Sequence, residues 1–127
     1  MHHRIRLSFF ALGLAFLAGS AFAGFGFPSA KGLDVFDVLA DPFAYQGVIT
    51  VRGGVMATDV GRGRFELVDY REYRGCRSVS CAPKWLTVLY DGKLPKKRDV
   101  VEVEGVVEKN AAGAGGFVLR AREVRVK

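Results

Sequence analysis

The chain has 127 residues, enough for one domain, and carries a formal net charge of +6 at pH 7. Its two histidines, His2 and His3, both lie in an N-terminal segment that we expect to be removed on export. The exported chain would then lack the commonest general base and the commonest ligand of transition metals. No other catalytic grouping stands out, so we expect a protein that is not an enzyme, with no metal site and no cofactor.

Residues 1–23 have the three parts of a secretory signal peptide. Two arginines form the positive start, residues 7–18 form an apolar run, and residues 21–23 (Ala-Phe-Ala) supply the small residues that signal peptidase recognises. The run is shorter than the about 20 residues of a membrane-spanning helix, and an uncleaved N-terminal anchor is the alternative. We expect a periplasmic or secreted protein that begins at Gly24, with a net charge of +4 and no stable membrane span.

The exported part is predicted to have a loose leader, residues 24–32, and one domain, residues 33–127. The leader is rich in Gly, Pro and Ser and shows no periodicity. Residues 33–40 have the apolar spacing of a short helix, and Asp41-Pro42 ends it, because a residue before proline avoids the α-helical region. The apolar stripe of this helix consists of Leu33, Phe36 and Leu39 or Ala40.

After Gly47 the apolar residues alternate with polar ones, which is the pattern of half-buried β-strands. The five alternating runs cover residues 49–55, 64–67, 85–90, 101–108 and 117–122. Val51, Val103 and Leu119 are predicted to lie in the core. Their charged neighbours Arg52, Glu102 and Arg120 are predicted to lie outside. The last run keeps its apolar face only if one residue is inserted, so we expect a β-bulge near Arg122-Glu123.

Five short strands favour a closed barrel, because closure removes the exposed edges of a sheet. Gly53 and Gly105 fall in mid-strand, where close approach of the backbone leaves no room for a side chain. The predicted fold class is therefore all-β, a small five-stranded Greek-key barrel of the OB type. One short N-terminal helix and the signal peptide precede it.

Several segments resemble exported bacterial OB-fold domains. Tyr45–Val55 resembles their first strand, Phe65–Asp69 the second, residues 86–105 the third and fourth, and Phe117–Val124 the fifth. The order is similar to that of the periplasmic haem chaperones of cytochrome c maturation. This resemblance implies an OB barrel and a link to the maturation of cytochrome c or of envelope proteins. Those chaperones attach haem through a His that the exported part lacks, so no haem site is carried over.

OB barrels commonly bind ligands on the outer face of strands two and three. The alternation places Trp85 and Thr87 on that face, and an indole among arginines can stack on a planar or anionic group. We therefore expect a non-catalytic binding or assembly module whose partner is another envelope protein or a small anionic or planar ligand. A purely structural role, with Trp85 covering a barrel end and the arginines solvated, fits each residue equally well. The predicted binding residues are Arg64, Tyr70, Tyr73, Arg77, Trp85 and Thr87, with Glu66 beside them.

Two alternatives stay open. Lys96–Arg98 and the basic last strand suit a single-stranded nucleic acid or another polyanion, although export and the Glu-rich fourth strand argue against it. Cys76 and Cys81 are the only cysteines, and an oxidising compartment favours a disulfide between them. Such a short ring constrains the unfolded chain little, so we expect a minor structural staple. The alternative is a redox-active pair beside Arg74 and Arg77.

The signal-peptide assignment is tested by intact-mass measurement of the protein recovered after export. We expect the mass of the chain that starts at Gly24. A retained Met1 in the membrane fraction would show an uncleaved anchor instead.

Overall fold

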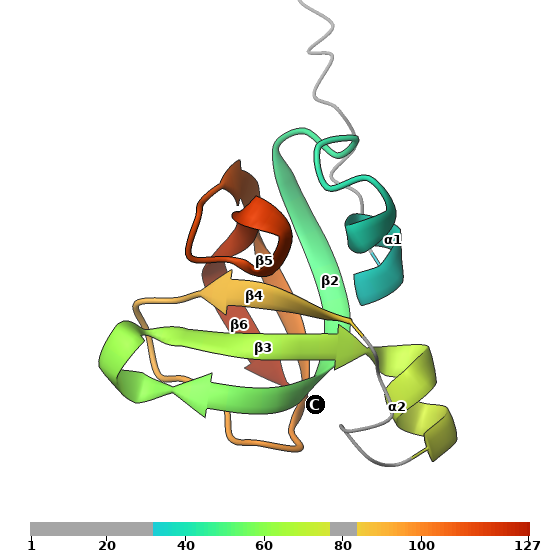
Figure 1. Cartoon of the computed structure of the whole chain (residues 1–127). Coiled ribbons are helices and arrows are strands. Elements are labelled where there is room, and N and C mark those ends of the chain that lie inside the picture. The colour runs from blue at the N-terminus through green and yellow to red at the C-terminus, as the bar shows by residue number, and fades with distance from the viewer. Residues whose placement is uncertain (1–31, 77–83) are drawn as a thin grey trace, which may run out of the picture.

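A computed structural model describes residues 32–76 and 84–127 (Figure 1). The signal peptide (residues 1–23), the leader as far as residue 31, Arg77 and Cys81 lie outside the described residues, and the statements about them stay predictions. In the part of the chain that the structure describes, no helix is long and apolar enough to cross a membrane.

The described residues form a closed barrel of five strands, with two short α-helices on its outside (Figure 1). The strands follow one another around the barrel in the order β2-β3-β4-β6-β5, and β5 pairs again with β2. Within the barrel β4 and β6 are parallel and the other pairs are antiparallel. This confirms the predicted all-β Greek-key barrel. The elements are β1 (Leu33–Asp34), α1 (Val35–Ala40), β2 (Val48–Asp59), the 3-10 helix η1 (Val60–Arg62), β3 (Arg64–Asp69), α2 (Tyr70–Cys76), β4 (Trp85–Leu89), β5 (Val100–Lys109), the 3-10 helix η3 (Ala114–Gly116) and β6 (Phe117–Val126).

Inward-facing residues of all five barrel strands fill the core. Val51, Val103 and Leu119 are fully buried, as predicted. Of the residues expected outside, Arg120 is exposed, whereas Arg52 and Glu102 are half-buried. Arg52 is partly covered because it forms an ion pair with Asp34 at 3.4 Å. Glu102 is partly covered because it forms ion pairs with Arg125 and Lys127.

The predicted bulge and the close approach at two glycines are confirmed. Glu104 pairs with Glu123 and Gly105 with Ala121, which leaves Arg122 as the extra residue of β6. A Cβ atom at Gly105 would lie 2.3 Å from the carbonyl oxygen of Arg120, and one at Gly53 would lie 2.7 Å from that of Val68. Both distances are too short for any side chain, so these glycines allow neighbouring strands to coil tightly.

The helices differ from the sequence-based prediction. Leu33 and Asp34 form β1, which pairs parallel with Val51 and Arg52, so α1 starts only at Val35. As a result the buried residues of α1 are Val35 and Val38, not the predicted stripe of Leu33, Phe36 and Leu39 or Ala40.

The second helix, α2, covers Tyr70–Cys76, where the sequence pattern predicts no helix. Its start is marked by Asp69, whose carboxylate accepts a hydrogen bond from the backbone N–H of Arg71 at 2.9 Å. Aspartate is a preferred residue at helix N-termini for this reason. That signal was present in the sequence, but a helix of seven residues is too short to show a clear apolar period.

The alternation also misplaces part of the outer surface. The alternation places Thr87 on the outer face, and it places Val118, two residues before Arg120, outside as well, yet they are 1% and 0% exposed. The loop between β5 and β6 covers both of them. The N–H of Ala114 donates a hydrogen bond to the Thr87 hydroxyl. Gly113 lies so close to Val118 that a Cβ atom on it would be 2.7 Å from the Val118 side chain. The glycine-rich loop between β5 and β6 therefore folds over part of the outer face.

Val103→Asp is expected to prevent folding, because it places a charge in an apolar interior without a partner. Val106→Asp is the matched control on the same strand, where the side chain is 40% exposed and the cross-strand neighbour is Arg120. The control should lose no more than about 1 kcal/mol. Soluble yield and melting curves of the two variants measure this, and equal behaviour would contradict the register.

Candidate functional site

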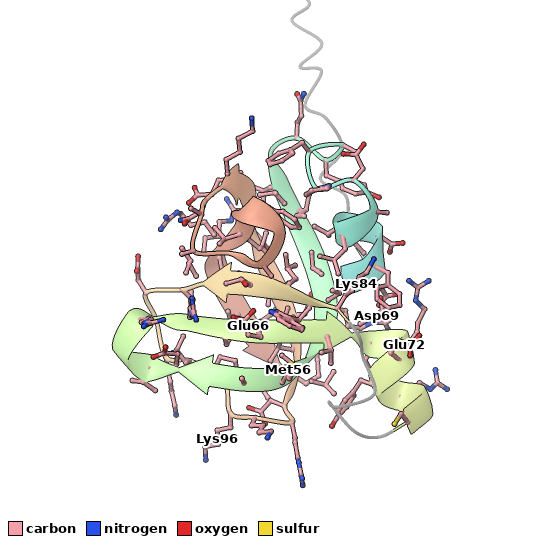
Figure 2. All side chains as sticks on the ribbon, in the orientation of Figure 1. Met56, Glu66, Asp69, Glu72, Lys84 and Lys96 are labelled. Carbon is pink, nitrogen blue, oxygen red and sulfur yellow. The ribbon has the colours of Figure 1, made fainter. Side chains whose placement is uncertain are left out.

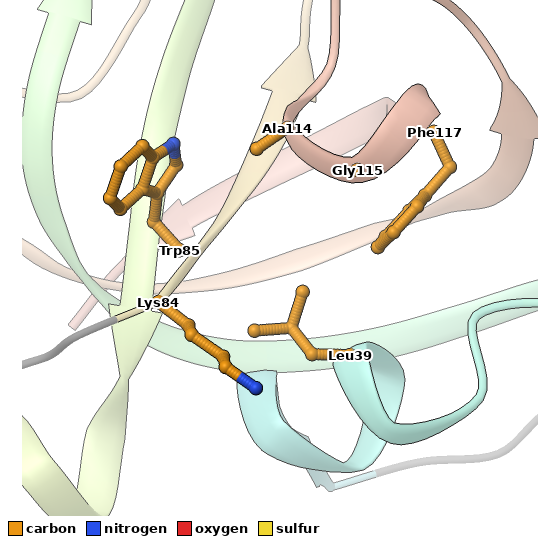
Figure 3. Close-up of a pocket in the computed structure, with 6 residues that line it drawn as sticks. All are labelled: Leu39, Lys84, Trp85, Ala114, Gly115 and Phe117. Carbon is orange, nitrogen blue, oxygen red and sulfur yellow. The ribbon is translucent and has the colours of Figure 1, made fainter.

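Trp85, at the start of β4, is the one tryptophan of the chain and is 40% exposed. Its indole forms one wall of a hollow of about 250 Å³ (Figure 3). The opposite walls come from α1 and from the loop between β5 and β6, so three separate parts of the chain meet here. The lining residues are Leu39, Lys84, Trp85, Ala114, Gly115 and Phe117.

This first hollow follows from how the barrel closes. β4 pairs with β6 only at Val88 and Leu89, so the first half of β4 has β3 as its one strand neighbour in the described part of the chain. The opening beside that half is filled by Leu39 of α1 and by η3, and the filling is incomplete. The hollow is therefore a property of the fold and does not depend on a loop moving aside.

A second hollow of about 360 Å³ lies on the other side of Trp85 and Ala114. It covers the outer face of β3 and β4, and Figure 2 shows Glu66 near the middle of that face with Met56 on the neighbouring strand β2. Its lining residues are Met56, Arg64, Glu66, Trp85, Thr87, Ala112, Gly113 and Ala114.

Hydrogen bonds fasten the β5–β6 loop to this face. The Thr87 hydroxyl donates to Glu66 Oε2 at 2.7 Å and accepts from the N–H of Ala114 at 3.2 Å. The Arg64 guanidinium donates to the carbonyl oxygen of Ala112 at 3.3 Å. These bonds fix the position of the loop that separates the two hollows.

The sequence of the loop suits this path. Asn110 Oδ1 accepts a hydrogen bond from the N–H of Ala112 at 2.9 Å, which is a turn-forming bond typical of Asn. A Cβ atom at Gly113 would lie 1.9 Å from the carbonyl oxygen of Phe117, so only glycine fits at this position. Gly115 and Gly116 have φ values of 75° and 82°, a region that glycine adopts without strain.

The α1 wall is positioned by Asp69 at the end of β3. Its buried carboxylate accepts hydrogen bonds from the N–H of Phe36, at the start of α1, at 2.9 Å and from Arg71. Burial by itself raises the pKa of Asp69, but the hydrogen bonds from Arg71 and from the backbone, with the positive charge of Arg71, outweigh it and hold the pKa below its ordinary value. Leu39 thus reaches the first hollow from a helix that this carboxylate anchors.

The structure brings three of the predicted binding residues together and separates the others. Arg64, Trp85 and Thr87 line the second hollow. Tyr70 and Tyr73 lie on α2 and line neither hollow: Arg52 stacks 4.0 Å from the Tyr70 ring centroid, and the Tyr73 ring packs on Gly54. The Tyr73 hydroxyl donates to the carbonyl oxygen of Arg98 at 3.0 Å. The sixth predicted residue, Arg77, lies outside the described residues.

Sequence reasoning did not find Leu39, Lys84 and Phe117 as parts of the site. The helical spacing around Leu39 and the alternation that begins at Phe117 predict only that both side chains face the apolar interior. Neither pattern indicates that a hollow reaches them. Lys84 directly precedes Trp85, and a cation next to the one exposed indole is a signal that could have been used.

Charge is distributed unevenly around the barrel. On the β5–β6 side, Arg120, Arg122 and Arg125 each form an ion pair with a glutamate of β5. The hydrogen bond from Arg120 lowers the pKa of Glu108, and that from Arg125 lowers the pKa of Glu102. Around the hollows, Arg64 and Lys84 have no carboxylate within ion-pairing distance among the described residues. In the described part of the chain, Arg64 and Lys84 therefore leave uncompensated positive charge beside Trp85, as Lys93, Lys96 and Lys97 do on the loop between β4 and β5.

The described ranges contain no group of three His, Cys, Asp or Glu residues that could hold a metal ion. Cys76 is the last residue of α2, whereas Cys81 lies outside the described residues, so their pairing stays a prediction. No model of a known protein family matches the chain, and no curated protein sequence matches it.

Asp69→Asn is expected to destabilise the protein by about 1–3 kcal/mol, because a buried hydrogen-bonded carboxylate is lost. A carboxyl group whose pKa is lowered by folding stabilises the protein above its unfolded pKa, and that stabilisation is lost as the pH falls through the lower folded value. The difference between wild type and variant should therefore be constant at neutral pH and shrink below about pH 4. Urea denaturation across this range measures it, and Asp91→Asn, on an exposed residue, is the control.

Proposed function

We propose that this chain is an exported, non-catalytic binding module that holds its ligand against Trp85. The observation that carries the proposal is the exposed indole between two hollows, with Arg64 and Lys84 beside it and neither paired with a carboxylate of the described residues. The proposed ligand group is planar or apolar and carries negative charge.

The position of this surface supports the proposal. OB barrels use the face of their second and third strands and the loop between the fourth and fifth for binding. In this barrel those parts are β3, β4 and the loop from Asn110 to Gly116, and they enclose the second hollow. Tryptophan in a well-packed, partly apolar setting is also the residue type that contributes most often to binding energy.

Binding of single-stranded nucleic acid is the second candidate. Arg64 and Lys84 beside an exposed indole suit the backbone and bases of such a strand. Against it, the three arginines of β6 are already paired with glutamates, which shortens any continuous basic track. Redox chemistry at Cys76 and Cys81 has no support beyond the sequence pattern.

The probe 8-anilinonaphthalene-1-sulfonate, which is aromatic and anionic, tests the proposal on the exported protein. We expect saturable binding to one site, with quenching of Trp85 emission and a rise in probe emission. Trp85→Ala should weaken binding by about tenfold or more, as expected for a central binding residue. Lys84→Gln should weaken it less, and high salt should remove most of that difference.

Val126→Ala is the control, because Val126 is 58% exposed and lines neither hollow. Binding that is unchanged in the Trp85→Ala variant, with an unaltered melting temperature, would refute the proposal. A 15-mer of deoxythymidine that binds at physiological salt and loses affinity steeply with added salt would favour the nucleic-acid alternative.

A further inference from the structure

The aromatic surface extends beyond the first hollow. Phe117, on its far wall, packs edge to face against Phe43, with the ring centroids 6.3 Å apart at 70°. Phe43 is 46% exposed, close to the 40% of Trp85 at the other end. Leu39, Phe43, Trp85 and Phe117 thus form a continuous apolar strip, with the first hollow in its middle.

The dimensions of the strip favour a polypeptide over a small molecule. The first hollow, at about 250 Å³, is smaller than the about 300–1,000 Å³ of pockets that enclose whole small ligands. It has room for one large side chain. The exposed rings of Trp85 and Phe43 on either side would then contact residues before and after that side chain. One anchored side chain flanked by aromatic contacts is a common arrangement in protein–protein interfaces.

The charges at the strip favour a particular pattern of charged residues in such a segment. Lys84 lines the hollow, and the Lys109 ammonium lies 5.8 Å from the centroid of the Phe43 ring, so a cation stands at each end. Neither lysine has an ion-pair partner among the described residues. The carboxylate of Glu66, which lines the second hollow with Trp85, accepts a hydrogen bond from Thr87. Acidic residues on both sides of the apolar anchor would therefore complement this surface.

Two other occupants fit less well. The leader of this chain, residues 24–32, contains Phe25 and Phe27 but no acidic residue, and it adds a further positive charge through Lys31. A second copy would have to offer an exposed apolar side chain. The most exposed one, Val60 at 80%, borders a basic loop that contains Lys93, Lys96 and Lys97. Both would bring positive charge towards Lys84.

We propose that the apolar strip binds an extended, acidic segment of another exported polypeptide and holds one of its large apolar side chains in the first hollow. This inference rests on the proposed function, because it uses the same Trp85 surface. It adds the chemical class of the partner and the role of Phe43, Lys84 and Lys109.

The test is binding of the exported protein to an array of random heptapeptides. We expect the bound peptides to be enriched about tenfold in sequences with a large apolar residue between Asp or Glu residues. Trp85→Ala should lower these signals by about tenfold or more. The double variant Lys84→Glu with Lys109→Glu should invert the charge preference, so that Lys and Arg now flank the apolar residue. Lys96→Glu, on the basic loop away from Lys84 (Figure 2), should leave the preference unchanged.

Selection that survives Trp85→Ala, or that ignores the charge reversal, would overturn the inference. Preferential binding of the leader peptide Gly-Phe-Gly-Phe-Pro-Ser-Ala-Lys, or a dimer that Trp85→Ala dissociates in sedimentation, would overturn it in favour of this chain's own residues. If the naphthalene sulfonate probe binds at Trp85 and no peptide is enriched, the inference fails and the proposed function stands. If neither binds, both fail.

Discussion

The carboxylate of Asp69 joins both helices to the barrel. It lies at the end of β3, fully buried, and accepts hydrogen bonds from the first turn of α1 and from the start of α2. An isolated buried charge would be costly, but here the guanidinium of Arg71 and the two backbone donors compensate for the lost hydration. Arg71 also forms ion pairs with Asp34 and Asp37, so the chain before β2 is fixed to the same point. The position of Leu39, and with it the shape of the first hollow, depends on this contact.

The barrel itself could be predicted from the sequence because apolar residues recur with a period of two along most of each strand. Even the insertion at Arg122 was visible, since Val124 otherwise falls on the wrong face. The short elements could not be predicted in the same way. Leu33 has the spacing of a helical residue but pairs with Val51 of β2, and a long-range pairing of two residues leaves no local signal. Tertiary contacts, not local propensity, decide such segments.

The candidate site was predictable only where it coincides with a strand. Arg64, Trp85 and Thr87 share the outer face of two paired strands, because Arg64 is opposite Leu89 and Trp85, Thr87 and Leu89 alternate along β4. Tyr70 and Tyr73 follow β3 directly, yet α2 turns them away towards Arg52 and Gly54. Phe117 and Lys84 join the site through the incomplete pairing of β4 with β6, which depends on how the barrel closes in three dimensions.

The glutamate–arginine pairs across β5 and β6 affect the electrostatic field that an approaching molecule experiences. Because these pairs neutralise the β5–β6 side, the uncompensated positive charge of the described residues lies elsewhere, beside Trp85 and on the loop between β4 and β5. An anionic molecule in that field is turned as well as attracted, so its collisions favour these basic regions over the β5–β6 side. The β5–β6 side, whose charges are paired, therefore affects the association rate of an anionic partner without contacting it. Added salt would lower the association rate of such a partner more than it would raise its dissociation rate.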